Sequence, residues 1–130
     1  MPRSFTLDEA NALLPRLREI LGEMQAKKAE LDHVRAELGQ MTRTASGNGH
    51  LLAQQMDRRR RDGEALAERL NELLGEVNRL GCELKGIEEG LIDFRSRREG
   101  RTVYLCWKLG EDSIGYWHEL DVGFAGRQPL

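Results

Sequence analysis

The sequence predicts a mainly α protein, in which a long antiparallel, coiled-coil-like helical hairpin carries a small C-terminal two-stranded β-hairpin. Three observations predict this fold class. Apolar residues recur at heptad spacing through the first two thirds of the chain, a cluster of turn-forming residues interrupts them once, and from Arg101 the apolar period changes to two. The 130 residues leave room for one domain. Its predicted parts are helix 6–41, turn 42–49, helix 50–92, β-hairpin 101–121 and tail 122–130.

The first helix begins with a capping box, because Thr6 can cap the helix and Glu9, three residues later, can bond back to the Thr6 amide. Lys27 is the one break in the apolar seam, and Pro15, which lacks an amide donor, predicts a kink near the start. The seam itself consists of Ala10, Leu13, Leu17, Ile20, Met24, Leu31, Val34, Leu38 and Met41.

The second helix is predicted from apolar spacings of three and four between Leu52 and Leu91, with breaks only at Arg59 and Gly63. The short connection makes the two helices antiparallel neighbours. One seam cannot cover every leucine of the pair, so we expect a homo-oligomer, most simply a dimer that forms a four-helix bundle. The alternative is a monomer whose C-terminal segment covers the remaining leucines, which are Leu14, Leu21, Leu51 and Leu74.

The β-hairpin is predicted from strict alternation on both sides of a turn at Glu111 and Asp112. We expect Trp107 to face Tyr116 and Leu105 to face His118, which places His118 in the middle of the apolar face. A two-stranded hairpin is barely stable alone in water, so its aromatic side chains are expected to pack on the open end of the helical hairpin.

The composition disfavours several classes of partner. The net charge of −2 gives no general attraction to nucleic acid or anionic lipid, and no apolar run is long enough to cross a membrane. The first helix cap follows the N-terminal Met closely, so we expect no signal peptide. Cys82 and Cys106 do not form a CxxC pair, so we expect free thiols and a cytoplasmic location.

Several stretches of this chain resemble one protein family. They are FTLDEANALLPRL near the start, GLIDF (90–94), VYLCWKLGE (103–111), GYWHELDVGF (115–124) and GRQPL at the end. The chain resembles the domain of unknown function 2203 family of small bacterial proteins along its whole length. That family has no established function, so the resemblance implies no activity. Arg95 stands where the family pattern has a Pro after Phe94.

His118 is the main candidate for chemistry, as a metal ligand or a proton carrier. The alternative is a half-buried histidine bonded to a backbone carbonyl or a carboxylate. The chain has no HExxH, no paired His and no cysteine pair, so a divalent metal is a possible cofactor and no more. The candidate metal ligands are His118, Glu111, Asp121 and Cys106, with Glu119 and Asp93 as further carboxylates. Cys106 has a second interpretation as a small apolar filler.

Trp107, Tyr116, Trp117 and Arg127 are the candidate binding residues of the aromatic cap. Arg127 either clamps an anion or pins the tail to a carboxylate. A phosphate-binding role for Arg58–Arg61 is disfavoured, because four consecutive helical residues point in four directions and acidic residues lie opposite on the first helix.

The predicted function is therefore a self-associating binding or scaffold module with the aromatic cap as its recognition surface. The first alternative is a metal or small-molecule site at the cap, built on His118 with nearby carboxylates. The second is nucleic-acid binding through Arg58–Arg61. No catalytic triad, phosphate-binding loop or nucleotide signature is present, which favours a protein that is not an enzyme without deciding the matter.

Overall fold

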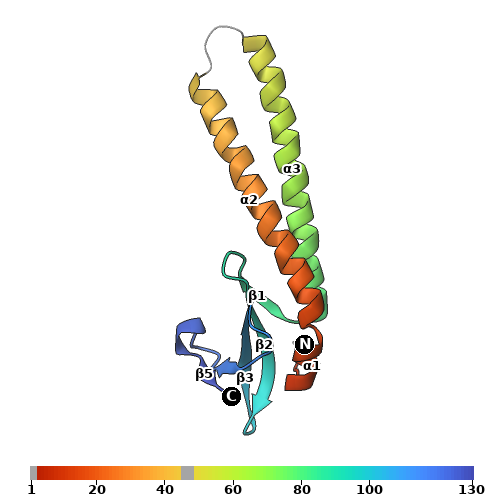
Figure 1. Ribbon diagram of the computed structural model, residues 1–130, viewed down its shortest axis with the longest axis vertical. Helices are drawn as coiled ribbons and strands as arrows, with labels where there is room; N and C mark the ends of the chain where they lie inside the picture. The colour runs from red at the N-terminus through yellow and green to blue at the C-terminus, as the bar shows by residue number, and fades with distance from the viewer. Residues whose placement is uncertain (1–2, 45–48) are drawn as a thin grey trace. The chain divides into compact units, whose positions relative to one another are not determined.

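A computed structural model describes residues 3–44 and 49–130 (Figure 1). Contacts divide the chain into two compact units, one of Met1–Gly22 with Leu74–Leu130 and one of Glu23–Leu73. The described elements are α1 (Leu7–Ala12), α2 (Leu14–Thr44), α3 (Gly49–Leu80), β1 (Glu83–Gly86), β2 (Leu91–Arg98), β3 (Arg101–Lys108), β4 (Tyr116–His118), the 3-10 helix η1 (Phe124–Gly126) and β5 (Gln128–Pro129).

The predicted fold class is wrong, because the first unit contains a five-stranded antiparallel sheet in the order β1-β2-β3-β4-β5 rather than a two-stranded hairpin. The second helix ends at Leu80 instead of residue 92. Gly81 has a φ of 92°, the left-handed conformation that commonly ends a helix. Leu84 and Leu91 continue the helical spacing, yet they lie in β1 and β2.

The β2–β3 hairpin is the element that the sequence analysis missed. Every residue of 91–98 pairs with a residue of 101–108, and Glu99 and Gly100 form the connection. Their φ values of 52° and 80° are typical of the two-residue turns that match the twist of a hairpin. Glu at the first turn position is unusual, since Asn, Asp or Gly normally occupies it. The sequence analysis therefore did not recognise a turn in this arginine-rich stretch.

The predicted register between β3 and β4 is also wrong, by one residue. Tyr104 pairs with His118 and Cys106 pairs with Tyr116, so His118 lies on the face of Cys106 and not on that of Leu105. The reason is that β3 ends at Lys108 and β4 begins only at Tyr116, which leaves a longer connection than a tight turn. Its far end is held by the Ile114 amide, which donates to Asn11 Oδ1 at 2.9 Å.

One face of the sheet forms the core of this unit together with the N-terminal segment. Phe5 meets Phe94 edge to face, with ring centroids 5.3 Å apart. Its amide donates to the Arg95 carbonyl at 2.7 Å and its carbonyl accepts from Ser96 Oγ at 2.6 Å, so the segment is tied to β2 on both sides. The largest buried side chains on this face are Ile92, Phe94, Leu105, Trp107 and Trp117.

The capping box at the start of the chain is confirmed. The Thr6 amide donates to Glu9 Oε1 at 2.8 Å, and the Glu9 amide donates to Thr6 Oγ1 at 3.1 Å. The single helix 6–41 is wrong, however, because α1 stops at Ala12 and α2 starts at Leu14. Pro15 has no amide hydrogen with which to continue the helical bonds across this point, which accounts for the interruption.

In the Glu23–Leu73 unit, ion pairs join α2 to α3. Arg69 donates to both carboxylate oxygens of Glu23, at 2.6 and 2.8 Å, and Arg59 donates to both oxygens of Glu37, at 3.1 and 2.5 Å. A side chain added at Gly63 would lie 3.4 Å from Val34, so the helices approach closely there. Residues 45–48 of the predicted turn 42–49 lie outside the described residues, whereas 42–44 belong to α2 and Gly49 begins α3.

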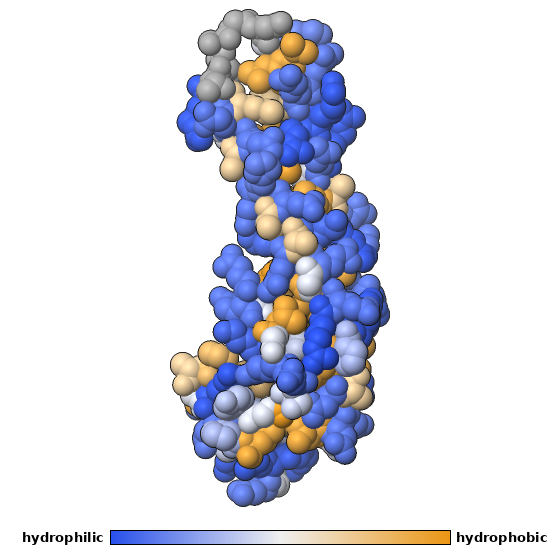
Figure 2. Space-filling model, viewed as in Figure 1, coloured by the Kyte–Doolittle hydropathy of each residue, from blue (hydrophilic) through white to orange (hydrophobic). Residues whose placement is uncertain are grey.

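None of the described helices has the length and apolar character that crossing a bilayer requires. On the face of the molecule shown in Figure 2, polar residues dominate and apolar residues appear as separate small areas.

Gly90 provides a stability test of the sheet. Its φ of 69° is left-handed, and an added Cβ would lie 2.5 Å from the Leu109 Cβ. Gly90→Ala should therefore reduce the free energy of unfolding by about 1–2 kcal/mol for the backbone strain and by about 1–3 kcal/mol more for the steric overlap. Urea unfolding followed by circular dichroism measures the sum of the two losses.

Gly100→Ala is the matched control, because Gly100 has a φ of 80° and nothing within 4 Å of an added Cβ. It should show the backbone cost alone. Equal losses for the two variants would contradict the predicted contact with Leu109.

Candidate functional site

The face of the sheet opposite the core carries a cluster of three polar side chains, which we call the Asp-Cys-His cluster. Asp93 lies on β2, Cys106 on β3 and His118 on β4, and the register places Asp93 beside Cys106. One ligand atom of each lies within 4.8 Å of the others. All three residues are buried, with exposed fractions of 4%, 1% and 2% respectively.

The hydrogen bonds of His118 define where its protons lie. Nδ1 is 2.8 Å from the Glu119 carbonyl oxygen, and a carbonyl can only accept, so Nδ1 carries a proton and donates it. Nε2 lies 3.1 Å from both carboxylate oxygens of Asp93. One further proton is therefore shared between Nε2 and the carboxyl group of Asp93.

Burial sets the acid–base properties of the other two members of the cluster. Loss of solvation raises the pKa of Asp93, and the nearby His118 opposes this increase. Burial and then the charge of Asp93 raise the pKa of the Cys106 thiol to about 11. Without a metal, Cys106 is consequently a protonated thiol at neutral pH.

A cavity of about 310 Å³ opens onto the cluster. Asp93, Cys106 and His118 all line it, and the chain after β4 covers part of the same face. The remaining walls are Lys85, Leu91, Tyr104, Leu120, Val122, Gly123 and Phe124. The three donor groups are thus largely buried but face an open pocket of the size of a small-ligand site.

Glu83 organises the wall that is formed by β1 and β3. It accepts from the Tyr104 hydroxyl at 3.1 Å, pairs with Lys85 at 3.1 Å and pairs with Arg95 at 3.2 Å. Lys85 Nζ and the Arg95 guanidinium also each lie 5.3 Å from the centre of the Tyr104 ring. These contacts fix the Tyr104 ring and the Lys85 ammonium group at the edge of the cavity.

The structure brings Cys106 and His118 together, as the sequence suggested, with Asp93 as the carboxylate. It does not bring in Glu111 or Asp121. Glu111 pairs with Arg127 at 2.9 Å and accepts from the Lys108 amide at 2.8 Å, and it is not a member of the cluster. Asp121 is exposed. The observed register of β4 differs from the predicted one by one residue, which explains why Asp93, and not Asp121, is the carboxylate beside His118.

The predicted aromatic binding residues serve mainly as packing. Trp107 is fully buried and its Nε1 donates to the Glu111 carbonyl at 3.0 Å, and Trp117 is 6% exposed. Arg127 lies 3.9 Å from the centre of the partly exposed Tyr116 ring and pairs with Glu111. Of the two interpretations of Arg127, the structure thus shows the one in which it pins the tail to a carboxylate.

Glu83, Lys85 and Tyr104 are the site residues that the sequence analysis missed. Residues 83–86 had been assigned to the second helix, so their position beside β3 was not foreseen. The signal that could have revealed them is Gly81, a glycine directly after the last strongly helical stretch.

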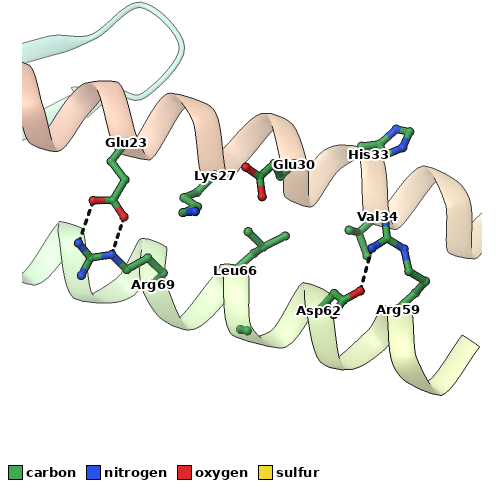
Figure 3. A pocket seen from close by; sticks show the side chains of 10 residues that line it. Glu23, Lys27, Glu30, His33, Val34, Arg59, Asp62, Leu66 and Arg69 are labelled. Carbon is green, nitrogen blue, oxygen red and sulfur yellow. Dashed lines mark hydrogen bonds and ion pairs between the residues drawn. The ribbon is translucent and has the colours of Figure 1, made fainter.

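A second pocket, of about 540 Å³, lies between α2 and α3 in the Glu23–Leu73 unit (Figure 3). Lys27 points across it toward α3, near Leu66, and the Glu23–Arg69 pair closes one end. At the other end Arg59 binds Glu37 and Asp62. The charged groups at both ends are thus already bound to one another, which makes this pocket a weaker candidate than the Asp-Cys-His cluster.

The arginine run 58–61 shows the salt bridges that its sequence context suggested. Arg59 pairs with Glu37 and Asp62, and Arg60 pairs with Asp57 at 3.0 Å. These acidic partners offset the positive charge that would otherwise attract a phosphate.

Residues 3–130 match the family described as "Uncharacterized conserved protein (DUF2203)". The chain belongs to this family. Neither the curated proteins nor the solved structures contain a match to it. The Pro that the resemblance leads us to expect at position 95, and the Arg that stands there, are both compatible with this fold. The Arg95 carbonyl accepts from Phe5, so the Arg95 amide also points away from β3, and a Pro there would remove no bond to β3.

The pairing of Asp93 with His118 makes a prediction about stability and pH. In His118→Ala, Asp93 loses its nearest positive partner, so its folded-state pKa should rise further above the unfolded value of about 4. A raised carboxyl pKa means that the folded state binds more protons, so the free energy of unfolding should fall as pH rises from about 4 to 7. At pH 7 the loss relative to the parent protein should be about 3 kcal/mol.

The double variant Asp93→Asn/His118→Ala is the control, because it contains no buried carboxylate at this position. Its stability should increasingly exceed that of His118→Ala as the pH is raised, as measured by urea unfolding at several pH values. A constant difference between the two variants would mean that the pKa of Asp93 is the same in the folded and unfolded states, which would contradict the predicted rise.

Proposed function

We propose that this protein binds one divalent transition-metal ion through Asp93, Cys106 and His118, with an open coordination position toward the cavity. The observation that carries the proposal is the convergence of three buried donor atoms within 4.8 Å. An imidazole nitrogen, a carboxylate oxygen and a thiolate sulfur form a ligand set that suits Zn²⁺.

The distances support a tetrahedral ion. Ligand atoms around tetrahedral zinc lie about 3.3–3.8 Å apart, given metal–ligand bonds of about 2.0–2.3 Å. His118 Nε2 is 3.1 Å from either oxygen of Asp93, so the ion requires only a small separation of these groups.

The contact on the other side of the imidazole also supports the proposal. Metal-bound histidines generally donate their second ring N–H to a carbonyl or carboxylate, which fixes the ring and its tautomer. The Nδ1 bond to the Glu119 carbonyl has this form and directs Nε2 toward Asp93 and the cavity. Three protein ligands and one open position are typical of zinc sites that bind or activate a further molecule.

Binding should release about two protons per ion at neutral pH. One comes from the Cys106 thiol, whose pKa is raised to about 11. The other is the proton shared between His118 Nε2 and Asp93.

Titration with Zn²⁺ or Co²⁺ provides the test. We expect one ion per chain, thiolate-to-cobalt charge-transfer absorption, and release of about two protons, obtained by calorimetry in buffers of different ionisation enthalpy. Cys106→Ser should weaken binding at least about 100-fold and reduce the proton release by about one.

Cys82→Ser is the matched control. Cys82 is also buried, but its sulfur contacts the Val77 carbonyl at 3.7 Å, and it is not a member of the cluster. This variant should bind the ion like the parent protein. Unchanged binding in Cys106→Ser, or no bound ion in the parent protein, would refute the proposed site.

We also propose self-association through the Glu23–Leu73 unit as a second function. Leu52, Met56, Leu66 and Leu70 of α3 are only half-buried and repeat at helical spacing, which supports a second copy as their partner. Light scattering should give a dimer that Leu66→Glu shifts toward monomer, whereas the exposed Glu64→Gln should leave it unchanged. A parent protein that is monomeric at every concentration would contradict this proposal.

A further inference from the structure

We infer that the cavity beside the Asp-Cys-His cluster binds a small, partly apolar organic anion, such as a monocarboxylate, with Lys85 holding its acid group. This inference rests on the proposed metal site, whose open position is the second contact for that group. The apolar part of the ligand lies against Leu91 and the segment 120–124.

The balance of charge around the cavity favours one negative charge on the ligand. A divalent ion bound by one carboxylate, one thiolate and a neutral imidazole has no net charge. At the wall formed by β1 and β3, two cations, Lys85 and Arg95, share the single carboxylate of Glu83. This wall therefore has an excess of one positive charge, which a bound anion would complement.

Lys85 is the cation that can reach the ligand. It lines the cavity, and its charge interacts with that of Asp93 on the cavity floor. Glu83 binds it through one oxygen at 3.1 Å, which leaves further N–H donors of the ammonium group for another acceptor. Arg95 supports the arrangement from outside the cavity through the other oxygen of Glu83.

The mouth of the cavity is apolar and cationic at once. Leu120, Val122 and Phe124 are 45%, 39% and 38% exposed, an unusual concentration of apolar surface in so short a segment. Lys108 lies 5.6 Å from the centre of the Phe124 ring. Asp121 is the acidic residue of this segment, and it is exposed, so water screens its charge.

The size and lining of the cavity limit the ligand. A volume of about 310 Å³ is at the lower end of the range for small-molecule sites. A purely inorganic anion would satisfy Lys85 but leave Leu91 and Leu120 without a partner. A cation of the same shape would meet the excess positive charge of the wall.

Calorimetric titration of the zinc-loaded protein with benzoate, inorganic phosphate and butylammonium tests the inference. Zinc content is measured on the same samples. We expect benzoate to bind more tightly than phosphate, and butylammonium not to bind. Lys85→Gln should weaken benzoate binding at least tenfold without loss of zinc. Lys28→Gln is the matched control, because Lys28 pairs with Asp32 in the Glu23–Leu73 unit and is outside the lining of the cavity, and it should change benzoate binding less than threefold.

The two proposals fail separately. A protein that keeps its zinc but binds benzoate no better than phosphate or butylammonium overturns the organic anion and leaves the metal site standing. Equal weakening by Lys85→Gln and Lys28→Gln overturns the role of Lys85. A protein that takes up no zinc refutes the proposed function, and the inference falls with it.

Discussion

The register of the antiparallel ladder through β2, β3 and β4 is the constraint on which the rest of the first unit depends. Side chains alternate between the two faces of a sheet, so the register determines which side chains lie on the same face and which of them are buried. With Cys106 beside Asp93 and Tyr104 beside His118, one face collects the apolar residues that pack on Phe5, and the other collects the polar cluster. A shift of one residue in β4 would move His118 into the apolar core beside Leu105 and separate it from Asp93. The same strand register therefore determines both the core of this unit and the position of the Asp-Cys-His cluster.

Burial on both faces requires that every polar group within the sheet has a partner. In the part of the chain that the structure describes, no buried side-chain nitrogen or oxygen lacks a hydrogen bond. His118 illustrates how this is achieved, since the Glu119 carbonyl takes one ring nitrogen and Asp93 takes the other. The pair is neutral overall in either arrangement of its shared proton, which lowers the free-energy cost of burying it in the absence of a metal.

The sequence predicted local features well and long-range pairing poorly. The capping box at Thr6 and the kink expected at Pro15 depend on neighbouring residues. The capping box occurs in the structure, and near Pro15 the helix is interrupted rather than only kinked. The end of the second helix was missed because Leu84 and Leu91 keep a helical spacing although Gly81 stops the helix. Cys106 and His118, with Asp93 as a further carboxylate, were named as candidates by residue type, and the structure places the three side chains close together. Their meeting with Asp93 could not be foreseen, because it requires the β2–β3 hairpin and a one-residue difference in the pairing of β4.

A purely structural role for the Asp-Cys-His cluster explains less of the geometry than a binding role does. Buried ion pairs are not in general more stabilising than apolar residues of the same volume, so stability alone gives little reason for this arrangement. A structural pair also needs no thiol as a third neighbour and no cavity against it, whereas here all three groups line the same space. Ionisable groups with perturbed pKa values that converge in a cavity are typical of functional sites. The raised pKa values of Asp93 and Cys106 fit this pattern, because the protons that burial retains are the ones that a bound cation would displace.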